Sequence, residues 1–263
     1  MRWMGLFLGA VLLVLPARAD KPRVVSLDYC ADQFVLGLAD REQILAVSKD
    51  AEKPFSYLRE RAAGIRKVRA SAEDVIALKP DIVVRSWGGD ARALDFYTSL
   101  GIWTIQIGYA VDFDAAAQIT RDIGAEIGQA DRAEALVQAM PAAAPASGIT
   151  AQYLTPSGVS AGSGTMVDAI IHAAGLVNAA EQPGWQTVSL EQLVMAPPRI
   201  ALTAFFGFDT DASDPWSASR HPVLKRILRQ AEQVKMDESR LTCPAWFVAD
   251  EAADLRRDIE ALN

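Results

Sequence analysis

The sequence is poor in the residues from which metal centres are built. Its 263 residues include two cysteines, Cys30 and Cys243, and two histidines, His172 and His221. No C-x-x-C or H-E-x-x-H spacing occurs, so a structural zinc site or a metal-hydrolase centre would lack its ligands. We therefore expect the chain to hold no metal and no cofactor of its own.

Basic residues are also in the minority. The chain carries 26 Lys and Arg against 33 Asp and Glu, a net charge of −7. It has no basic stripe, which argues against nucleic acid or an anionic membrane as a partner. Hydrophobic residues make up 51% of the chain, enough to bury the core of one large or two small domains.

Only the N-terminus carries a long apolar run. Arg2 precedes the run Met4–Leu15, and Ala17-Arg18-Ala19 follows it as a small-x-small cleavage site. This pattern predicts a cleaved secretory signal peptide at residues 1–19 and a periplasmic protein. The alternative, a membrane anchor, is disfavoured because the run is short. Cleavage leaves 24 basic residues against 33 acidic ones, a net charge of −9.

The rest of the chain alternates between short β-rich runs and helical patterns, which predicts α/β structure with mostly parallel sheets. We expect an N-terminal lobe at residues 20–112, a helical connector at 113–148 and a C-terminal lobe at 149–263. In open α/β sheets, ligands bind beyond the carboxyl ends of the strands. The strand ending near Val84 is followed by Arg85, Trp87 and Gly88, so these residues should face a ligand cleft between the lobes.

Five segments carry a resemblance to a known family. They are "RVVSL" at Arg23, "SAEDVIALKPDIVV" at Ser71, "SLGI" at Ser99, "HAAGLVN" at His172 and "WQTVSLEQL" at Trp185. Together they resemble the periplasmic substrate-binding proteins of ABC importers for cobalamin, haem and ferric siderophores. The resemblance implies two Rossmann-like lobes joined by one rigid helix, and solute binding without catalysis. It also implies a corrinoid, ferric siderophore or haem as ligand, and permease subunits as partners of a monomeric protein.

The same resemblance assigns roles to individual residues. Glu73 and Glu191 match the glutamates, one on each lobe, that dock onto the permease; the alternative is that each merely stabilises the start of its helix. Trp87 and Trp185 match aromatic positions in the cleft of vitamin B12 binders. We expect Gly88 to let the backbone approach the ligand.

Loop placement alone adds further candidates to the ligand site. Arg85 would pair with a ligand carboxylate or phosphate, or else with Asp81. Tyr29, Tyr109, Phe205, Phe206, Phe208 and Trp216 are aromatic candidates, for each of which core packing is the alternative.

Three features depart from the family pattern. Pro141 and Pro145 interrupt the connector early, and "APPRI" stands where a Pro-Asp is usual before a strand. The third feature is the cysteine pair. In an oxidising compartment Cys30 and Cys243 should form a disulfide between the lobes, and the alternative is two free thiols that touch the ligand.

A serine hydrolase is the rival interpretation. "GVSAG", residues 158–162, fits G-x-S-x-G around Ser160, and possible partners follow in the order Asp, His. These are Asp209, Asp211, Asp214 and His221. The motif requires a strand, a sharp elbow and an immediate helix, whereas Pro156 and Ser157 break this strand, so we expect binding rather than catalysis.

Overall fold

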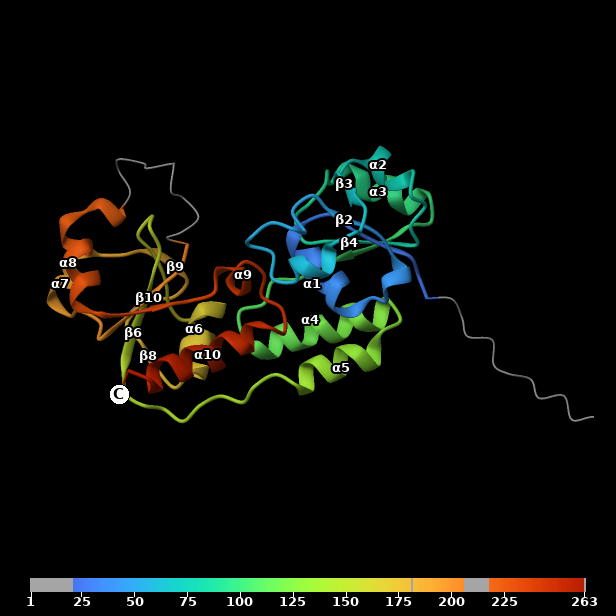
Figure 1. Ribbon diagram of the computed structural model, residues 1–263. Helices are drawn as coiled ribbons and strands as arrows, with labels where there is room; N and C mark the ends of the chain where they lie inside the picture. The colour runs from blue at the N-terminus through green and yellow to red at the C-terminus, as the bar shows by residue number, and fades with distance from the viewer. Residues whose placement is uncertain (1–20, 181, 206–217, 263) are drawn as a thin grey trace, which may run out of the picture.

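The structure, a computed structural model, describes residues 21–180, 182–205 and 218–262. The expected signal peptide lies outside these residues. The described chain forms two α/β lobes that stand side by side, each around its own parallel sheet (Figure 1). Within these ranges no helix is both long and apolar enough to cross a membrane.

The N-terminal lobe contains a five-stranded parallel sheet in the order β3-β2-β1-β4-β5. Its strands are β1 Val24–Ser26, β2 Ile44–Ser48, β3 Lys67–Val68, β4 Ile82–Arg85 and β5 Trp103–Gln106. Its helices are α1 Tyr29–Leu38, α2 Ala72–Ile76 and α3 Arg92–Ser99, and two short 3₁₀ turns cover Arg41–Gln43 and Arg59–Ala62. This is the alternation that the sequence predicts.

Side-chain alternation along β4 separates the two layers of the N-terminal core. Ile82 and Val84 pack in one cluster with residues of α1 and α4, whereas Val83 packs in the other with Val75 of α2 and Tyr97 of α3. In Figure 1 the sheet accordingly lies between α2 and α3 on one side and α1 and α4 on the other.

The C-terminal lobe is built on a four-stranded parallel sheet, β11-β10-β6-β8, and a two-stranded antiparallel ladder of β7 and β9. The strands are β6 Thr150–Leu154, β7 Val159–Ala161, β8 Val177–Asn178, β9 Trp185–Thr187, β10 Ile200–Thr203 and β11 Glu232–Lys235. The helices are α6 Met166–Ala173, α7 Leu190–Met195, α8 Pro222–Gln230, α9 Glu238–Leu241 and α10 Val248–Glu260, with a 3₁₀ turn at Ala218–Arg220. The pairing of β7 with β9 and the helix α9 have no clear signal in the sequence.

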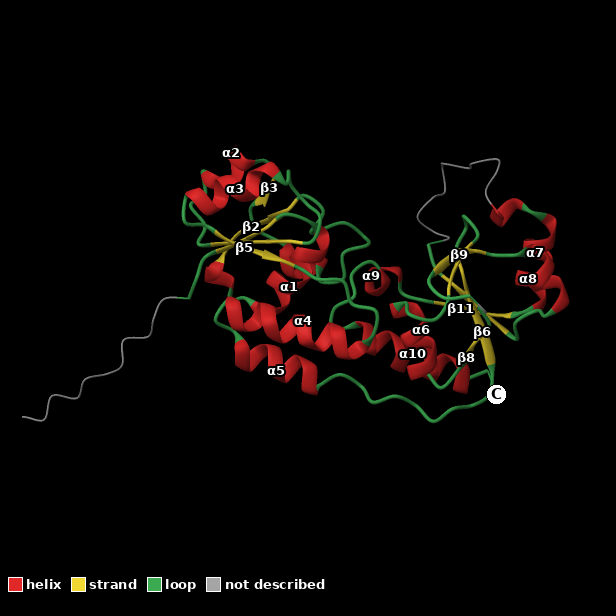
Figure 2. Cartoon of the chain, turned by 180° about the vertical axis from the view of Figure 1, so that it is seen from behind, coloured by secondary structure: helices red, strands yellow, loops and turns green. Residues whose placement is uncertain are grey.

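The connector is not the single rigid helix that the resemblance implies. It is a hairpin of two helices, α4 Phe113–Glu126 and α5 Ala130–Gln138, which lie side by side in Figure 2. Gly128 has φ +72°, a left-handed conformation that lets the chain reverse between them. The expected interruption by Pro141 and Pro145 is present, because residues 141–149 contain no helix or strand.

The extended segment 141–149 forms a strap between the hairpin and β6 (Figure 2). The strap is held by hydrogen bonds at the end of α6: Ala144 N donates to Ala173 O and Ser147 N donates to Gly175 O, each at 2.7 Å. A Cβ on Gly175 would lie 2.4 Å from Pro145 O, and its φ is +81°. The glycine of the "HAAGLVN" segment therefore allows the strap to pass closely over α6.

A second crossing ties the lobes together. Residues 242–248, which we call the inter-lobe arm, follow α9 but pack against the N-terminal lobe. Thr242 Oγ1 donates to Phe55 O at 2.9 Å, and Phe247 packs on Tyr57 with ring centroids 4.3 Å apart. Trp246 lies over α1, where a Cβ on Gly37 would come within 2.2 Å of its ring.

The arm is also held covalently. Cys30, in the first turn of α1, and Cys243 form the disulfide that the sequence led us to expect. Their Cα atoms are 5.2 Å apart, within the usual range for such a bond, and both residues are buried. Cys30 and Cys243 are therefore part of the packed junction between the lobes rather than free thiols.

Removing this bond should destabilise the whole protein. The bridge spans 213 residues of sequence, for which chain-entropy arguments set an upper value of about 5 kcal/mol. We expect the double variant Cys30→Ala/Cys243→Ala to lose about 2–5 kcal/mol in urea unfolding. Thiol titration of the unfolded, unreduced wild type should find no free thiol. Two free thiols per chain, or a double variant as stable as the wild type, would contradict this assignment.

Candidate functional site

Aromatic side chains gather where the strands of the N-terminal sheet end. Tyr29 follows β1, Phe55 follows β2, Trp87 follows β4 and Tyr109 follows β5. The Tyr29 ring lies 5.3 Å from the rings of both Phe55 and Trp87, in edge-to-face geometry. Trp87 is 58% exposed and Tyr109 68% exposed, which is unusual for residues of this size. The carboxyl edge of this sheet thus presents an aromatic surface.

The C-terminal lobe contributes Trp185 to the same region. Trp185 pairs with Ala161 in the antiparallel ladder and packs edge-on against Tyr153, with ring centroids 6.2 Å apart. It stays 53% exposed, and its Nε1 donates a hydrogen bond to Tyr109 Oη at 3.4 Å. This contact joins the two lobes. We call the six residues the inter-lobe aromatics: Tyr29, Phe55, Trp87, Tyr109, Tyr153 and Trp185.

A single buried carboxylate positions Trp87. Asp28, 2% exposed, accepts hydrogen bonds from Ser86 N at 2.7 Å, Ser86 Oγ at 2.6 Å, Gly88 N at 2.9 Å and Trp87 N at 3.3 Å. It also caps α1 by accepting from Ala31 N at 2.9 Å. Asp28 therefore binds the loop after β4 to the start of α1 and places Trp87 beside Tyr29.

Gly88 lies at a close contact between the loop after β4 and the end of β1. It is buried, and an added Cβ would lie 2.6 Å from Leu27 O and 2.9 Å from the Asp28 Cβ. The missing side chain therefore lets the loop approach Leu27 and Asp28.

Arg85 does not lie among the inter-lobe aromatics. It is 8% exposed and leaves β4 on the same face as Val83, toward α3. The expected alternative, a pairing with Asp81, is wrong. Asp81 instead accepts hydrogen bonds from the backbone N, Nε and Nη2 of Arg23.

The Tyr29 phenol sits in an environment that opposes its ionisation. Burial raises its pKa, and the negative charges of Asp28 and Asp50 act in the same direction. Tyr29 therefore remains a neutral phenol, able to donate a hydrogen bond, at any physiological pH.

The two glutamates expected to meet a permease lie on the surface of different lobes. Glu73 belongs to α2, which Ser71 caps through Asp74 N, and Glu191 belongs to α7, which Ser189 caps through Gln192 N. Both glutamates are exposed. On α7 the next positions of the same helical face are Val194 and Met195, which are 47% and 85% exposed. Both carboxylates are therefore accessible from outside the protein.

The arrangement around Ser160 rules out the hydrolase interpretation. Ser160 is fully buried in β7, and its hydroxyl lies 3.5 Å from Gln152 Nε2. His221 is the N-cap of α8 and its Nδ1 accepts from Val223 N at 3.2 Å. The geometry therefore lacks the Ser–His pair of a hydrolase, and Asp209, Asp211 and Asp214 lie outside the described residues.

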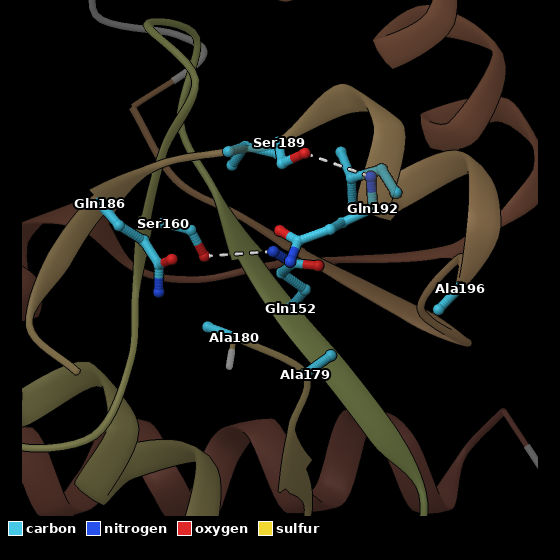
Figure 3. Close-up of a pocket in the computed structure, with 10 residues that line it drawn as sticks. Gln152, Ser160, Ala179, Ala180, Gln186, Ser189, Gln192 and Ala196 are labelled. Atoms are coloured by element: carbon cyan, nitrogen blue, oxygen red, sulfur yellow. Dashed lines mark hydrogen bonds between the residues drawn. The ribbon is translucent and has the colours of Figure 1, made fainter. Parts of the chain in front are cut away.

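Figure 3 shows the cavity beside Ser160. Its volume is about 40 Å³, room for water but far below that of a substrate pocket. Uncharged side chains line it: Gln152, Ser160, Ala179, Ala180, Gln186, Val188, Ser189, Gln192, Leu193 and Ala196.

Two expected ligand residues, Phe206 and Trp216, lie outside the described residues, as does Phe208. Phe205 has φ +65° and its N donates to Glu238 Oε1 at 3.2 Å. Among the described residues, no three His, Cys, Asp or Glu side chains are grouped so that they could hold a metal ion.

Comparisons with known proteins agree on one family and one fold. A family profile described as "Periplasmic binding protein" matches residues 24–230. Compared with curated protein sequences, the chain has no significant match.

Several solved structures share the fold at low sequence identity. A possible iron-binding periplasmic solute-binding protein from Staphylococcus epidermidis superposes with a TM-score of 0.70 at 18% identity, covering 91% of this chain and 98% of its own. A periplasmic haem-binding protein of Vibrio cholerae gives 0.68 at 19%, covering 90% and 98%. A periplasmic vitamin B12-binding protein of Vibrio cholerae gives 0.59 at 16%, covering 92% and 97%.

Replacing Asp28 should cost more than the loss of a helix cap. Asp28→Ala removes the cap of α1 and leaves the Ser86, Trp87 and Gly88 amides without their acceptor. We expect a loss of at least about 2 kcal/mol in unfolding free energy. Asp112→Ala is the matched control, because Asp112 is exposed and caps α4 through Ala115 N alone. It should lose about 1 kcal/mol. Equal losses in urea unfolding would show that Asp28 does not organise the loop.

Proposed function

The chain belongs to the periplasmic binding protein family, and we propose that the solute it carries is a bulky metal chelate: a corrinoid, a ferric siderophore or a haem. As a member of this family it is a non-catalytic substrate-binding protein of an ABC transporter. The proposal concerns the identity of the solute, where the solute binds and how the protein meets its permease.

The observation that carries this proposal is the contact between Trp185 and Tyr109. It brings exposed aromatic rings of the two lobes together at the carboxyl edge of the N-terminal sheet, where ligands of open α/β sheets bind. A solute held there would touch both lobes at once. Flat, largely apolar chelates suit a site lined by aromatic rings, because aromatic side chains offer a large contact area at a small cost in conformational entropy.

The names of the structural neighbours support the same ligand class, since they include proteins named for haem, vitamin B12 and iron. We further propose that residues 1–19 are removed on export and that the mature protein works in the periplasm. The Cys30–Cys243 disulfide fits that oxidising compartment.

We also propose that Glu73 and Glu191 dock on the permease. They are exposed near the starts of helices on different lobes, so one partner must reach both lobes to contact both carboxylates. The chain is acidic overall, which suits a partner with basic contact residues.

Removing the side chain of either Trp87 or Trp185 should weaken solute binding. We expect Trp87→Ala and Trp185→Ala each to raise Kd by roughly 5- to 150-fold, the equivalent of about 1–3 kcal/mol. Titrations with cobalamin, cobinamide, haemin and ferric siderophores, followed by tryptophan fluorescence and by calorimetry, would measure this change. Trp103→Ala is the matched control. Trp103 is 62% exposed but lies at the start of β5, away from the carboxyl edge.

If a solute binds and neither Trp87→Ala nor Trp185→Ala weakens it relative to Trp103→Ala, the solute lies elsewhere. If none of the chelates binds, the proposed ligand class is wrong although the family assignment stands.

Reversing the docking charges should separate transport from binding. We expect Glu73→Arg and Glu191→Arg to retain the wild-type Kd for the solute and to abolish uptake, because like charges would then face each other at the permease. Uptake of labelled solute by cells that carry each variant tests this. Glu60→Arg, an exposed glutamate in a 3₁₀ turn, carries the same change of charge as a control. Normal uptake by both docking variants would refute the assignment.

A further inference from the structure

Arg85 is a buried cation for which the described part of the chain provides no acceptor. Only 8% of the residue is exposed, and its Nε and Nη1 atoms are fully buried without a hydrogen-bond partner. A guanidinium stays protonated in proteins, so Arg85 places a positive charge here, with Nε and Nη1 enclosed and Nη2 nearer the surface. An uncompensated buried charge is among the most unfavourable groups a fold can contain, and most such groups are paired with an ion or a carboxylate.

Two hydroxyl groups in the same layer are also without partners. Tyr97 Oη and Thr104 Oγ1 are buried and make no hydrogen bond to the described residues. Thr104 stands opposite Val83 in the β4–β5 register, so Thr104, Val83 and Arg85 share one face of the sheet. Tyr97 packs on that face from α3 in the same cluster as Val83. The three unpartnered groups therefore share the layer between β4, β5 and α3.

The electrostatics agree with this placement. Burial raises the pKa of the Tyr97 phenol, while the positive charge of Arg85 acts to lower it and the negative charge of Glu73 to raise it. Arg85 is thus within electrostatic range of Tyr97. The acids that might neutralise Arg85 are engaged or exposed, since Asp81 pairs with Arg23 and Glu73 is on the surface of α2.

We propose that Arg85, Tyr97 and Thr104 form a binding site for a small monovalent anion of halide size inside the N-terminal lobe. The guanidinium supplies the charge and two N–H donors, and the two hydroxyl groups supply further donors. Such an anion neutralises the buried guanidinium and satisfies the hydroxyl groups that no protein atom reaches. It binds the folded chain and not the unfolded one, so it stabilises the lobe in proportion to its concentration.

This anion is distinct from the transported solute. Arg85 leaves β4 toward α3, whereas the loop that follows carries Trp87 to the inter-lobe aromatics and is held there by Asp28. The anion site therefore does not depend on the proposed ligand class, and it would stand if none of the chelates bound.

Bromide is the probe, because it replaces chloride and scatters anomalously near its absorption edge. We expect crystals of the mature wild-type protein in sodium bromide to show an anomalous peak within hydrogen-bond distance of Arg85 and Tyr97. Crystals of Arg85→Met should lack this peak and keep any surface bromides. An ordered water at Arg85 with no anomalous peak would overturn the proposal, as would a solute carboxylate at Arg85 in a crystal of the loaded protein.

A solution measurement gives an independent answer. At equal ionic strength, replacing sodium gluconate by bromide well above the bromide Kd should raise the wild-type Tm by about 2–4 °C. Arg92→Met removes an exposed charge from α3 and should keep that rise, whereas Arg85→Met should lose it. In gluconate Arg85→Met should be at least as stable as the wild type, because it removes an unpaired buried charge. A bromide response that survives in Arg85→Met refutes the site, and if that variant does not fold the wild-type crystal decides.

Discussion

The junction between the inter-lobe arm and the N-terminal lobe is the constraint on which the rest of the structure depends. The connector contributes a helical hairpin and an extended strap, neither of which spans the lobes as a stiff rod. The Cys30–Cys243 disulfide and the rings of Trp246 and Phe247 supply that stiffness instead, packed on α1 and Tyr57. They hold the lobes at the separation where Trp185 reaches Tyr109, so the geometry of the proposed solute site follows from this junction.

Three consecutive residues at the end of β1 connect this junction to the site. Asp28 holds the loop that carries Trp87, Tyr29 packs edge-on against Trp87, and Cys30 is bonded to the arm. The residues that follow the central strand β1 therefore connect the position of Trp87 to the Cys30–Cys243 disulfide between the lobes. Asp28 and Cys30 are both buried, so water cannot replace their bonding partners. This keeps the loop and the arm in fixed positions relative to β1.

Arg85 shows why sequence reasoning about the site was incomplete. Its position at the end of an apolar run correctly predicted the end of a strand. A strand, however, places alternate side chains on opposite faces of its sheet. Which of these faces a helix covers depends on how the whole chain packs. The sequence also offered Asp81 as its partner, four residues away, whereas the fold brings Arg23 to Asp81 across neighbouring strands. Gly88 likewise marked a close backbone approach, but only the tertiary structure identifies Leu27 and Asp28 as what it approaches.

Local chemistry by itself determined the alternation of strands and helices in the N-terminal lobe, the cap at Ser71 and the family, because hydrophobic periodicity, capping and short motifs act over a few residues. The disulfide could also be anticipated, since the two cysteines of a chain that is expected to be exported can pair only with each other. The tertiary structure alone decided the reversal of the connector at Gly128, the insertion of Trp246 beside Gly37 and the placement of Arg85, Tyr97 and Thr104 in one layer. These features join residues distant along the chain, and such contacts form only when the whole chain has packed.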